Sequence, residues 1–345
     1  MSVHSSRWYA VFIACTFSTL VLGQQPATTV DWHEEAQLPP LFSLASAPTF
    51  HKQRFWVSAG AGITVYGGVS AGLWKAWYKN FPRTRFHTFN DWNEWMGVDK
   101  AGHLFSAYMA SNYSFQGANW TGMPRRRAMW TAIGIGMGIQ TTIEVMDGFS
   151  EKWGFSWGDM AFNALGAGVF ATQELLWQEQ RIVFKSSGQR PAYSSEPVFS
   201  DNGERTTTLK DRAVQLYGTS PFEAFIKDYN ALTTWGSVNI SSFIKKRNSR
   251  FPRWLNLAVG YGAGNIYGGE DNTWTTEDGI IFTLDEMAYP RYRRFYLSPD
   301  IDWTRIPSRH RWVKFTLGLL NWVKIPAPVL ELNTLGNVHF HPMRW

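Results

Sequence analysis

Charged and polar side chains are concentrated between residues 99 and 168, inside segments that are otherwise apolar and rich in glycine. Such groups cost free energy in apolar surroundings unless they are paired, hydrogen-bonded or bound to a metal. They fall on separate segments, which would have to fold together before the groups could act on one another. The candidate polar cluster consists of Asp99, Lys100, His103, Glu144, Asp147, Ser156, Asp159 and Asn163.

One interpretation of the cluster is a metal-dependent hydrolase. Carboxylates and a histidine on facing helices can hold a divalent cation, which activates a water molecule. His103 or Glu144 would be the general base, and the substrate would be a lipid or a cell-wall component. A divalent metal is the one cofactor that this hypothesis requires. Its possible ligands are His103, Glu144, Asp147 and Asp159.

The favoured interpretation is a buried network that fixes how the helices pack. Lys100 stands beside Asp99 and offers an ion-pair partner, whereas a metal site would exclude a neighbouring ammonium group. Polar networks can specify helix register where glycine leaves little side-chain volume to do so. Enzymatic activity stays open but is not favoured. The expected contacts are Lys100 with Glu144 or Asp147, His103 with Asp159 or Asn163, and Trp157 with a carbonyl oxygen.

Glycine-rich apolar segments must position the cluster, and their lengths favour helices. A helix through residues 99–113 places Asp99 and His103 one turn apart on one face. Small residues at four-residue spacing, as at Gly68 and Gly72, should let helices approach closely. The predicted helices cover about residues 55–77, 99–113, 128–146 and 159–177.

Local signals mark where these helices begin and end. Asp91 and Glu94 have the spacing of a capping box that would open the second helix. Ser156 or Asp159 can cap the fourth helix, and Gly148 should end the third.

The pattern changes after about residue 180, where apolar and small or polar residues alternate with a period of two. This alternation is typical of strands, and it is strictest at residues 255–262 and 295–303. Residues 312–325 could form an amphipathic helix or a further strand. Weaker strand candidates are residues 182–186, 235–241, 329–333 and 338–341.

The sequence therefore predicts an α+β chain. A glycine-rich bundle of about four helices is followed by an antiparallel β region, which would form a partial or small barrel-like sheet. The expected divisions are a signal peptide at residues 1–23, a linker at 24–49, a helical domain at 50–178 and the antiparallel β region at 179–345.

The first 23 residues have the features of an export signal, with Arg7 followed by an apolar run and small residues before Gln24. A retained signal anchor is the alternative. The only cysteine, Cys15, lies within this run and has no lipobox before it. An exported chain without this segment would hold no disulfide, thiol nucleophile or thiolate metal site.

Composition favours a protein that meets an interface. Aromatic residues reach 16%, with 19 Trp, while charged residues make up only 17%. An aromatic-rich core would give the same composition. The net charge is +6, and its basic clusters at residues 125–127, 245–253 and 291–294 lack any nucleic-acid-binding motif. A solvated surface accounts for these basic clusters more simply than a partner does, and anionic lipid headgroups are the partner that they favour over nucleic acid. The expected partners are membrane lipid and envelope proteins, and no nucleic acid.

Three motifs occur in order along the helical segments. They are Asp99-Lys100 with His103, Glu144 with Asp147, and the turn at residues 154–159 followed by Asn163 and Gly166. Together they resemble the YfiM-like family of predicted bacterial envelope lipoproteins. The resemblance covers about residues 95–170 of this chain. It implies that the helical unit stands alone in short members and that the C-terminal half is an addition, of a kind that looks like Bacteroidota envelope proteins. Those members are lipoproteins, so the missing lipobox implies another means of membrane attachment here.

The order of the motifs also looks, more loosely, like the VanZ-like membrane family, and neither family implies a catalytic mechanism. Together, these patterns predict an exported bacterial envelope protein at the outer membrane or the periplasmic face of the envelope. Its expected role is that of a structural or accessory subunit of an envelope assembly. The alternative is the metal-dependent hydrolase described above.

Overall fold

The structure is a computed structural model that describes residues 39–78, 82–219, 226–244 and 251–345. The expected signal peptide, residues 24–38 of the expected linker and the basic residues 245–250 lie outside the described residues. The described chain belongs to one compact unit, Leu38–Trp345. Its four long helices precede its main sheet, and this segregation of helices from strands is that of the predicted α+β class.

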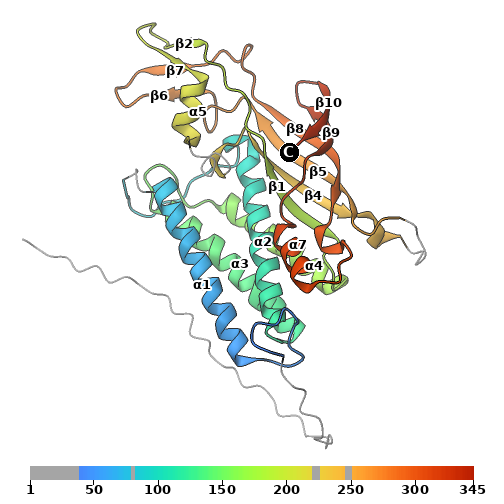
Figure 1. Ribbon diagram of the computed structural model, residues 1–345. Helices are drawn as coiled ribbons and strands as arrows, with labels where there is room; N and C mark the ends of the chain where they lie inside the picture. Colours follow the sequence, from blue (N-terminus) through green and yellow to red (C-terminus); the bar gives the residue numbers. More distant parts are fainter. Residues whose placement is uncertain (1–38, 79–81, 220–225, 245–250) are drawn as a thin grey trace, which may run out of the picture. The chain divides into compact units, whose positions relative to one another are not determined.

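Four α-helices form the first half of the described chain, and each covers a predicted helix. A π-helical turn, Trp74–Tyr78, continues the first helix, and a 3-10 turn, Glu94–Gly97, precedes the second. The second helix packs along the third and fourth (Figure 1). The helices are α1 (Lys52–Leu73), α2 (Val98–Trp120), α3 (Arg125–Gly148) and α4 (Trp157–Leu176).

Glycine allows α2 to lie close against its neighbours. A Cβ atom at Gly166 of α4 would lie 2.2 Å from the carbonyl oxygen of Leu104. A Cβ atom at Gly136 of α3 would lie 2.4 Å from a serine hydroxyl on α2, so neither position has room for a side chain. The prediction for Gly68 and Gly72 is wrong, because no atom of the residues that the structure describes lies within 4 Å of a Cβ atom at either position.

The main sheet is antiparallel, with the strand order β1-β4-β5-β8-β9-β10. Each of its strands was predicted from alternation. The sheet is open, since no ladder of the described residues joins β10 to β1. Residues 312–325, whose pattern was ambiguous, contain the helix α7 (Arg311–Leu320). The strands are β1 (Ile182–Gly188), β4 (Leu232–Asn239), β5 (Leu255–Gly264), β8 (Tyr292–Ile301), β9 (Ala327–Asn333) and β10 (Val338–Arg344).

Several short elements between these strands were not predicted, because three-residue strands are too short to show a period. Two small ladders pair β2 with β3 and β6 with β7. The short elements are β2 (Pro197–Phe199), β3 (Thr206–Thr208), α5 (Leu209–Tyr217), β6 (Thr273–Thr275), β7 (Ile281–Thr283) and the 3-10 turns Ile240–Phe243 and Trp303–Arg305.

The two faces of the sheet have opposite polarity, and the polar face is the buried one. Register places Leu257 and Val259 of β5 on the same face as Leu297 of β8 and Leu330 of β9, and all four are more than 40% exposed. Residues that alternate with them are buried and mostly polar. They include Lys185, Trp235, Ser237, Asn256, Ser298, Asp300 and Glu331.

An ionic network fills the buried face. The ammonium group of Lys185 lies 2.9 Å from the Asp300 carboxylate, which also accepts a hydrogen bond of 2.6 Å from Ser237. Lys324 lies 3.9 Å from the other oxygen of Asp300 and is fully buried. Burial lowers the pKa of Lys324 to about 8, because the charged form loses its hydration and faces only part of one carboxylate.

Aromatic residues connect the helices to the first strand. Tyr108 of α2 packs edge-on against Phe184 of β1, with ring centroids 5.2 Å apart, and its hydroxyl donates to the Ile182 carbonyl. The described part of the expected linker lies against the other end of the helices, where the buried Arg54 donates to the carbonyls of Pro40 and Ala45. No described helix has both the length and the apolar character that crossing a membrane requires.

Candidate functional site

The candidate polar cluster forms where α2, α3 and α4 meet the segment before α2. That segment contains three consecutive residues with positive φ, Trp95 (51°), Met96 (57°) and Gly97 (77°). Positive φ costs energy in non-glycine residues, so the surroundings must enforce it. The Trp95 ring lies 4.9 Å from that of Tyr229, and the Tyr261 hydroxyl donates to the Met96 carbonyl. Contacts from the second half of the chain therefore set where α2 begins.

Lys100 lies at the centre of the cluster and is 3% exposed. Its ammonium group is 2.7 Å from Asp91 Oδ2 and 2.7 Å from Asp159 Oδ1. The Ser156 hydroxyl donates to Asp91 Oδ1 at 2.5 Å and accepts from the Asp159 amide at 3.0 Å, so Ser156 caps α4 as predicted. The predicted pairing of Lys100 with Glu144 or Asp147 is wrong.

The capping box predicted at Asp91 and Glu94 is also not formed. Asn93 is the residue that precedes the 3-10 turn, and its side chain makes no capping bond. The Asp91 carboxylate instead contacts the side chains of Lys100 and Ser156, which come from α2 and from the start of α4. Only the backbone bond from the Glu94 amide to the Asp91 carbonyl, 2.9 Å, remains of the expected motif.

His103 lies one turn after Asp99, as predicted, and both of its ring nitrogens face oxygen atoms. Nδ1 is 3.1 Å from Asn163 Oδ1, which confirms that expected contact, and 3.5 Å from Glu144 Oε1. Nε2 is 3.8 Å from Asp159 Oδ1 and 3.9 Å from Asp99 Oδ2. Since acceptors lie on both sides of the ring, the surroundings favour the doubly protonated imidazolium.

The two acids near the C-terminal end of α3, Glu144 and Asp147, accept hydrogen bonds from different donors. Glu144 is 1% exposed, and its Oε2 accepts from the Ser156 amide at 3.2 Å. Among the described residues, no hydrogen-bond donor reaches its Oε1. Asp147 Oδ1 accepts from the Tyr78 hydroxyl at 2.7 Å. These donors offset the unfavourable position of two carboxylates at a helix C-terminus.

Burial dominates the titration of the cluster. It raises the pKa of Glu144 and of Asp147 to about 7, because the ionised carboxylates lose hydration. Burial, together with the charge of Asp99, also raises the pKa of Asp159. Burial acts in the opposite direction on His103, but the surrounding carboxylates outweigh it and raise its pKa. Because these carboxyl pKa values are raised, some of the cluster's carboxyl groups stay protonated near neutral pH.

Two residues that contact the cluster escaped the sequence interpretation. Asp91 was assigned to a local cap, and Tyr229, whose hydroxyl donates to Asp99 at 3.0 Å, lies far along the chain. The spacing of Gln140, Glu144 and Asp147 does predict one polar stripe on the third helix, and Gln140 donates to Asn163 Oδ1 at 2.8 Å. Trp157, expected to donate to a carbonyl, is 71% exposed and packs edge-on against Phe155.

Two of the four predicted metal ligands, His103 and Asp159, come together, and Asp99, which was not predicted as a ligand, lies with them. Asp99, His103 and Asp159 each offer one ligand atom, and these atoms lie within 4.8 Å of one another. Oxygen and imidazole donors in this arrangement suit a divalent cation. However, Lys100 lies 2.7 Å from the Asp159 oxygen that faces His103, so a cation would have to compete with an ammonium group. Asp147 is bound to Tyr78 rather than to this group.

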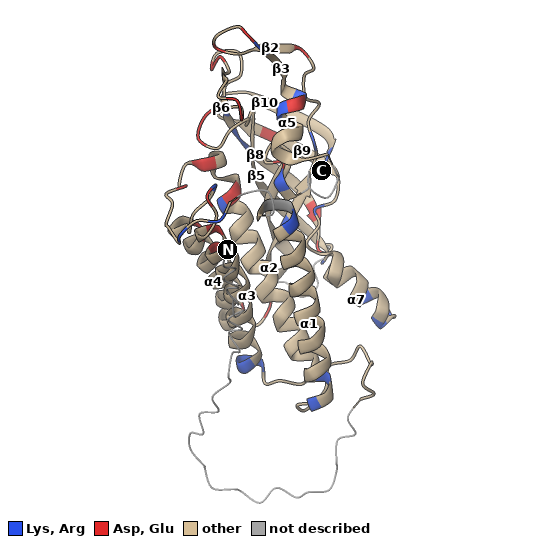
Figure 2. Cartoon of the chain, turned by 90° about the vertical axis from the view of Figure 1, so that its left-hand side faces the viewer, with Lys and Arg blue, Asp and Glu red and all other residues tan. Residues whose placement is uncertain are grey.

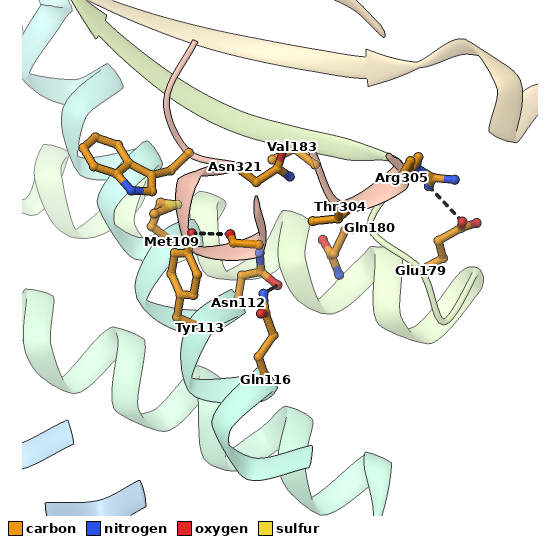
Figure 3. A pocket seen from close by; sticks show the side chains of 12 residues that line it. Met109, Asn112, Tyr113, Gln116, Glu179, Gln180, Val183, Thr304, Arg305 and Asn321 are labelled. Carbon is orange, nitrogen blue, oxygen red and sulfur yellow. Dashed lines mark hydrogen bonds and ion pairs between the residues drawn. The ribbon is translucent and has the colours of Figure 1, made fainter. Parts of the chain in front are cut away.

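A separate cavity of about 290 Å³ lies beside the C-terminal half of α2 (Figure 3). Tyr113 and Gln116 of α2 line one side, and an ion pair of 2.8 Å between Arg305 and Glu179 lies at the other. The Tyr113 hydroxyl donates to the carbonyls of Gly318 and Leu319, which attaches the end of α7 to α2. None of the predicted site residues lines this cavity.

Residues 88–174 match the model of a family described as predicted periplasmic lipoprotein (DUF2279). The match covers 87 of the 345 residues and contains every member of the candidate polar cluster. It supports an exported envelope protein and an envelope lipoprotein family of unknown function. The YfiM-like name and the likeness to the VanZ-like family stay predictions. No curated protein and no solved structure matches the chain.

Proposed function

We propose that this protein is a structural or accessory component of the bacterial envelope that associates with the lipid of the outer membrane. The observation that supports this role is the reversed polarity of the main sheet. Val259, Leu332 and Phe340 are 55%, 52% and 66% exposed on its outer face, while Asn256 and Asp300 are buried on the other.

In water, a sheet with its apolar face buried and its polar face exposed is favoured, because burial of apolar surface is the main driving force of folding and buried charges are costly. Lipid acyl chains would cover the exposed apolar face of β5, β8 and β9, because they are apolar and need no hydrogen-bond partners from it. The ionic network behind it, centred on Lys185 and Asp300, satisfies the polar groups away from that face. A lipid-facing sheet therefore accounts for both faces.

The candidate polar cluster has a structural role in this proposal. It joins α2 to α4 through Lys100 and Asn163, and α3 to the start of α4 through the bond from the Ser156 amide to Glu144. Tyr229 joins it to the second half of the chain. Glu144 and Asp159 are buried, and the side chain of Asp99 is only 23% exposed, so little of the cluster is open to a substrate.

Membrane fractionation of cells that express the full chain tests the association. A Val259→Lys/Leu330→Lys variant should move from the membrane to the soluble fraction, because both side chains are exposed and the charges would enter lipid. The control Thr275→Lys/Met287→Lys adds the same charge at exposed positions outside the main sheet and should stay in the membrane fraction. A wild-type chain found only in the soluble fraction would overturn the proposal.

The accessory role makes a separate prediction. Purification in mild detergent should recover other envelope proteins together with this chain. A lone monomer at every detergent strength would contradict a role as subunit of an assembly, while leaving the lipid association intact.

A metal-dependent hydrolase is the second candidate, and the proximity of Asp99, His103 and Asp159 favours it. The bound cation would supply an activated water, and Glu144 Oε1, which accepts no hydrogen bond from the described residues and lies 3.5 Å from His103 Nδ1, would be the acceptor nearby. Metal analysis of the purified protein, compared with His103→Ala and Glu144→Gln variants, tests it. Protein without bound metal, and variants that lose folding rather than a selective activity, would rule this candidate out.

A further inference from the structure

Helix α7 presents apolar and basic side chains together. Trp312, Phe315 and Leu319 follow a spacing of three and four residues, which places them on one face, and they are 64%, 54% and 46% exposed. Arg311 and Lys314 are exposed on the same helix. No residue of α7 is buried, so the core of the protein does not explain its apolar face.

The stretch of sequence that contains α7 carries charge of one sign. The sequence contains no Asp or Glu from residue 303 to residue 330, and α7 is drawn with basic positions only (Figure 2). Among the described residues, no carboxylate pairs with Arg311 or Lys314. An exposed helix of this composition is typical of segments that lie in the interface of an anionic membrane.

A hollow of about 420 Å³ lies between α7 and the segment near Leu44. Arg311, Lys314 and Phe315 line it on the side of α7, and Leu44 and Ala45 line it on the other. The latter side is fixed in place, because the Arg54 side chain donates to the Ala45 carbonyl at 2.6 Å. The C-terminal end of α7 is likewise held by Tyr113. The hollow is thus bounded by two attached segments.

We infer that α7 and the adjacent hollow bind anionic phospholipid of a bilayer. Arg311 and Lys314 would contact the lipid phosphate, while Trp312, Phe315 and Leu44 would enter the boundary between headgroups and acyl chains. The inference rests on the proposed lipid association and names the place where the charge of the lipid is recognised.

Flotation of the purified full chain with vesicles tests this inference. The two lipid compositions are phosphatidylcholine alone and phosphatidylcholine mixed with phosphatidylglycerol. Wild type should bind the anionic vesicles more tightly. The Arg311→Gln/Lys314→Gln variant should lose roughly 30-fold of that partitioning, which corresponds to about 1 kcal/mol for each basic residue at the surface.

The control variant Arg85→Gln/Lys210→Gln removes the same charge at exposed positions outside α7, and it should bind as wild type does. A Trp312→Ala/Phe315→Ala variant should bind both kinds of vesicle more weakly. These substitutions affect only exposed side chains, so the unfolding temperature should not change.

The outcomes distinguish the lipid association of the protein from the role of α7 in binding anionic phospholipid. Wild type that floats with neither vesicle would overturn the lipid association itself. Equal binding to both vesicles, or an Arg311→Gln/Lys314→Gln variant that binds as wild type does, would overturn only the role of α7. Competition by inorganic phosphate that abolishes flotation would show an ion site, and co-purification of a protein through α7 would show a protein interface; either result would also overturn it.

Discussion

Replacing Lys100 by methionine tests whether the candidate polar cluster holds the helices together. The substitution keeps the unbranched apolar part of the side chain but removes the ammonium group and its two contacts of 2.7 Å, to Asp91 and Asp159. Both carboxylates stay buried, at 7% and 5% exposure. Removing one partner of a buried ion pair costs about 3–5 kcal/mol, because the remaining charge is uncompensated. At about 2.1 cal/mol/K of unfolding entropy per residue, a loss of about 4 kcal/mol lowers the unfolding temperature of a chain of 345 residues by about 6 °C.

The pH dependence of this loss follows from the same contacts. In Lys100→Met, the carboxyl groups of Asp91 and Asp159 lie close together in apolar surroundings, so their folded-state pKa values rise above the unfolded value of about 3.9. The folded state then binds more protons than the unfolded state over this interval. The stability of the variant should therefore recover as the pH falls from 7 towards 4.

Thermal and urea unfolding followed by circular dichroism between pH 4 and pH 8 measures both effects. The control Lys210→Met removes an exposed lysine of α5 and should change stability by less than about 0.5 kcal/mol. Adding Asp91→Asn and Asp159→Asn to Lys100→Met should restore much of the loss, since amides carry no charge. A deficit below about 1 kcal/mol, or one that is the same at pH 4 and pH 7, would refute the reasoning.

Three further predictions concern packing and buried charge. Gly166→Ala should destabilise the fold by about 2–3 kcal/mol in urea unfolding, because its Cβ would meet the Leu104 carbonyl, whereas Gly168→Ala on the same helix has open space and should gain up to about 1 kcal/mol. Lys324→Met should raise stability at pH 7 by up to about 3 kcal/mol, because the lowered pKa of Lys324, about 8 against 10.5, means that its charged form is unfavourable in the fold, while Lys185 still neutralises Asp300. In wild type, the same shift should make stability rise as the pH rises from 8 to 10.5. The raised pKa of Glu144, about 7 against 4.5, should make the stability of wild type fall by about 3 kcal/mol as the pH rises from 4.5 to 7, because the folded state holds the proton more tightly. The Glu144→Gln variant has no carboxyl group at this position and should lose most of this pH dependence in thermal unfolding.

Each of these predictions has a result that would contradict it. Equal effects of alanine at Gly166 and Gly168 would show that α2 and α4 do not depend on a close contact at Gly166. A Lys324→Met variant that loses several kcal/mol would show that the ammonium group is needed on the buried face of the sheet. A Glu144→Gln variant with an unchanged pH profile would place the titration elsewhere in the cluster.

The sequence by itself determined the elements of this protein. Alternation with a period of two located every strand of the main sheet, and long apolar segments located α1 to α4. It also identified the residues of the cluster, since ionisable groups inside apolar segments are unusual wherever they fold. These features are local, because side-chain periodicity follows directly from the backbone geometry of a helix or strand. The short strands β2, β3, β6 and β7 were missed for the same reason, since they are too brief to show a period.

Only the tertiary structure decided which groups meet. Lys100 could be assigned several acidic partners by spacing, but the fold brings it to Asp91 and Asp159, the first of which had a plausible local role as a cap. The alternation showed that each strand has an apolar and a polar face without showing which one is buried. Packing of the chain put the face of Lys185 and Asp300 inside and left that of Val259 and Leu330 exposed. Both outcomes depend on contacts between residues far apart in the chain, and no local pattern encodes the free energy of those contacts.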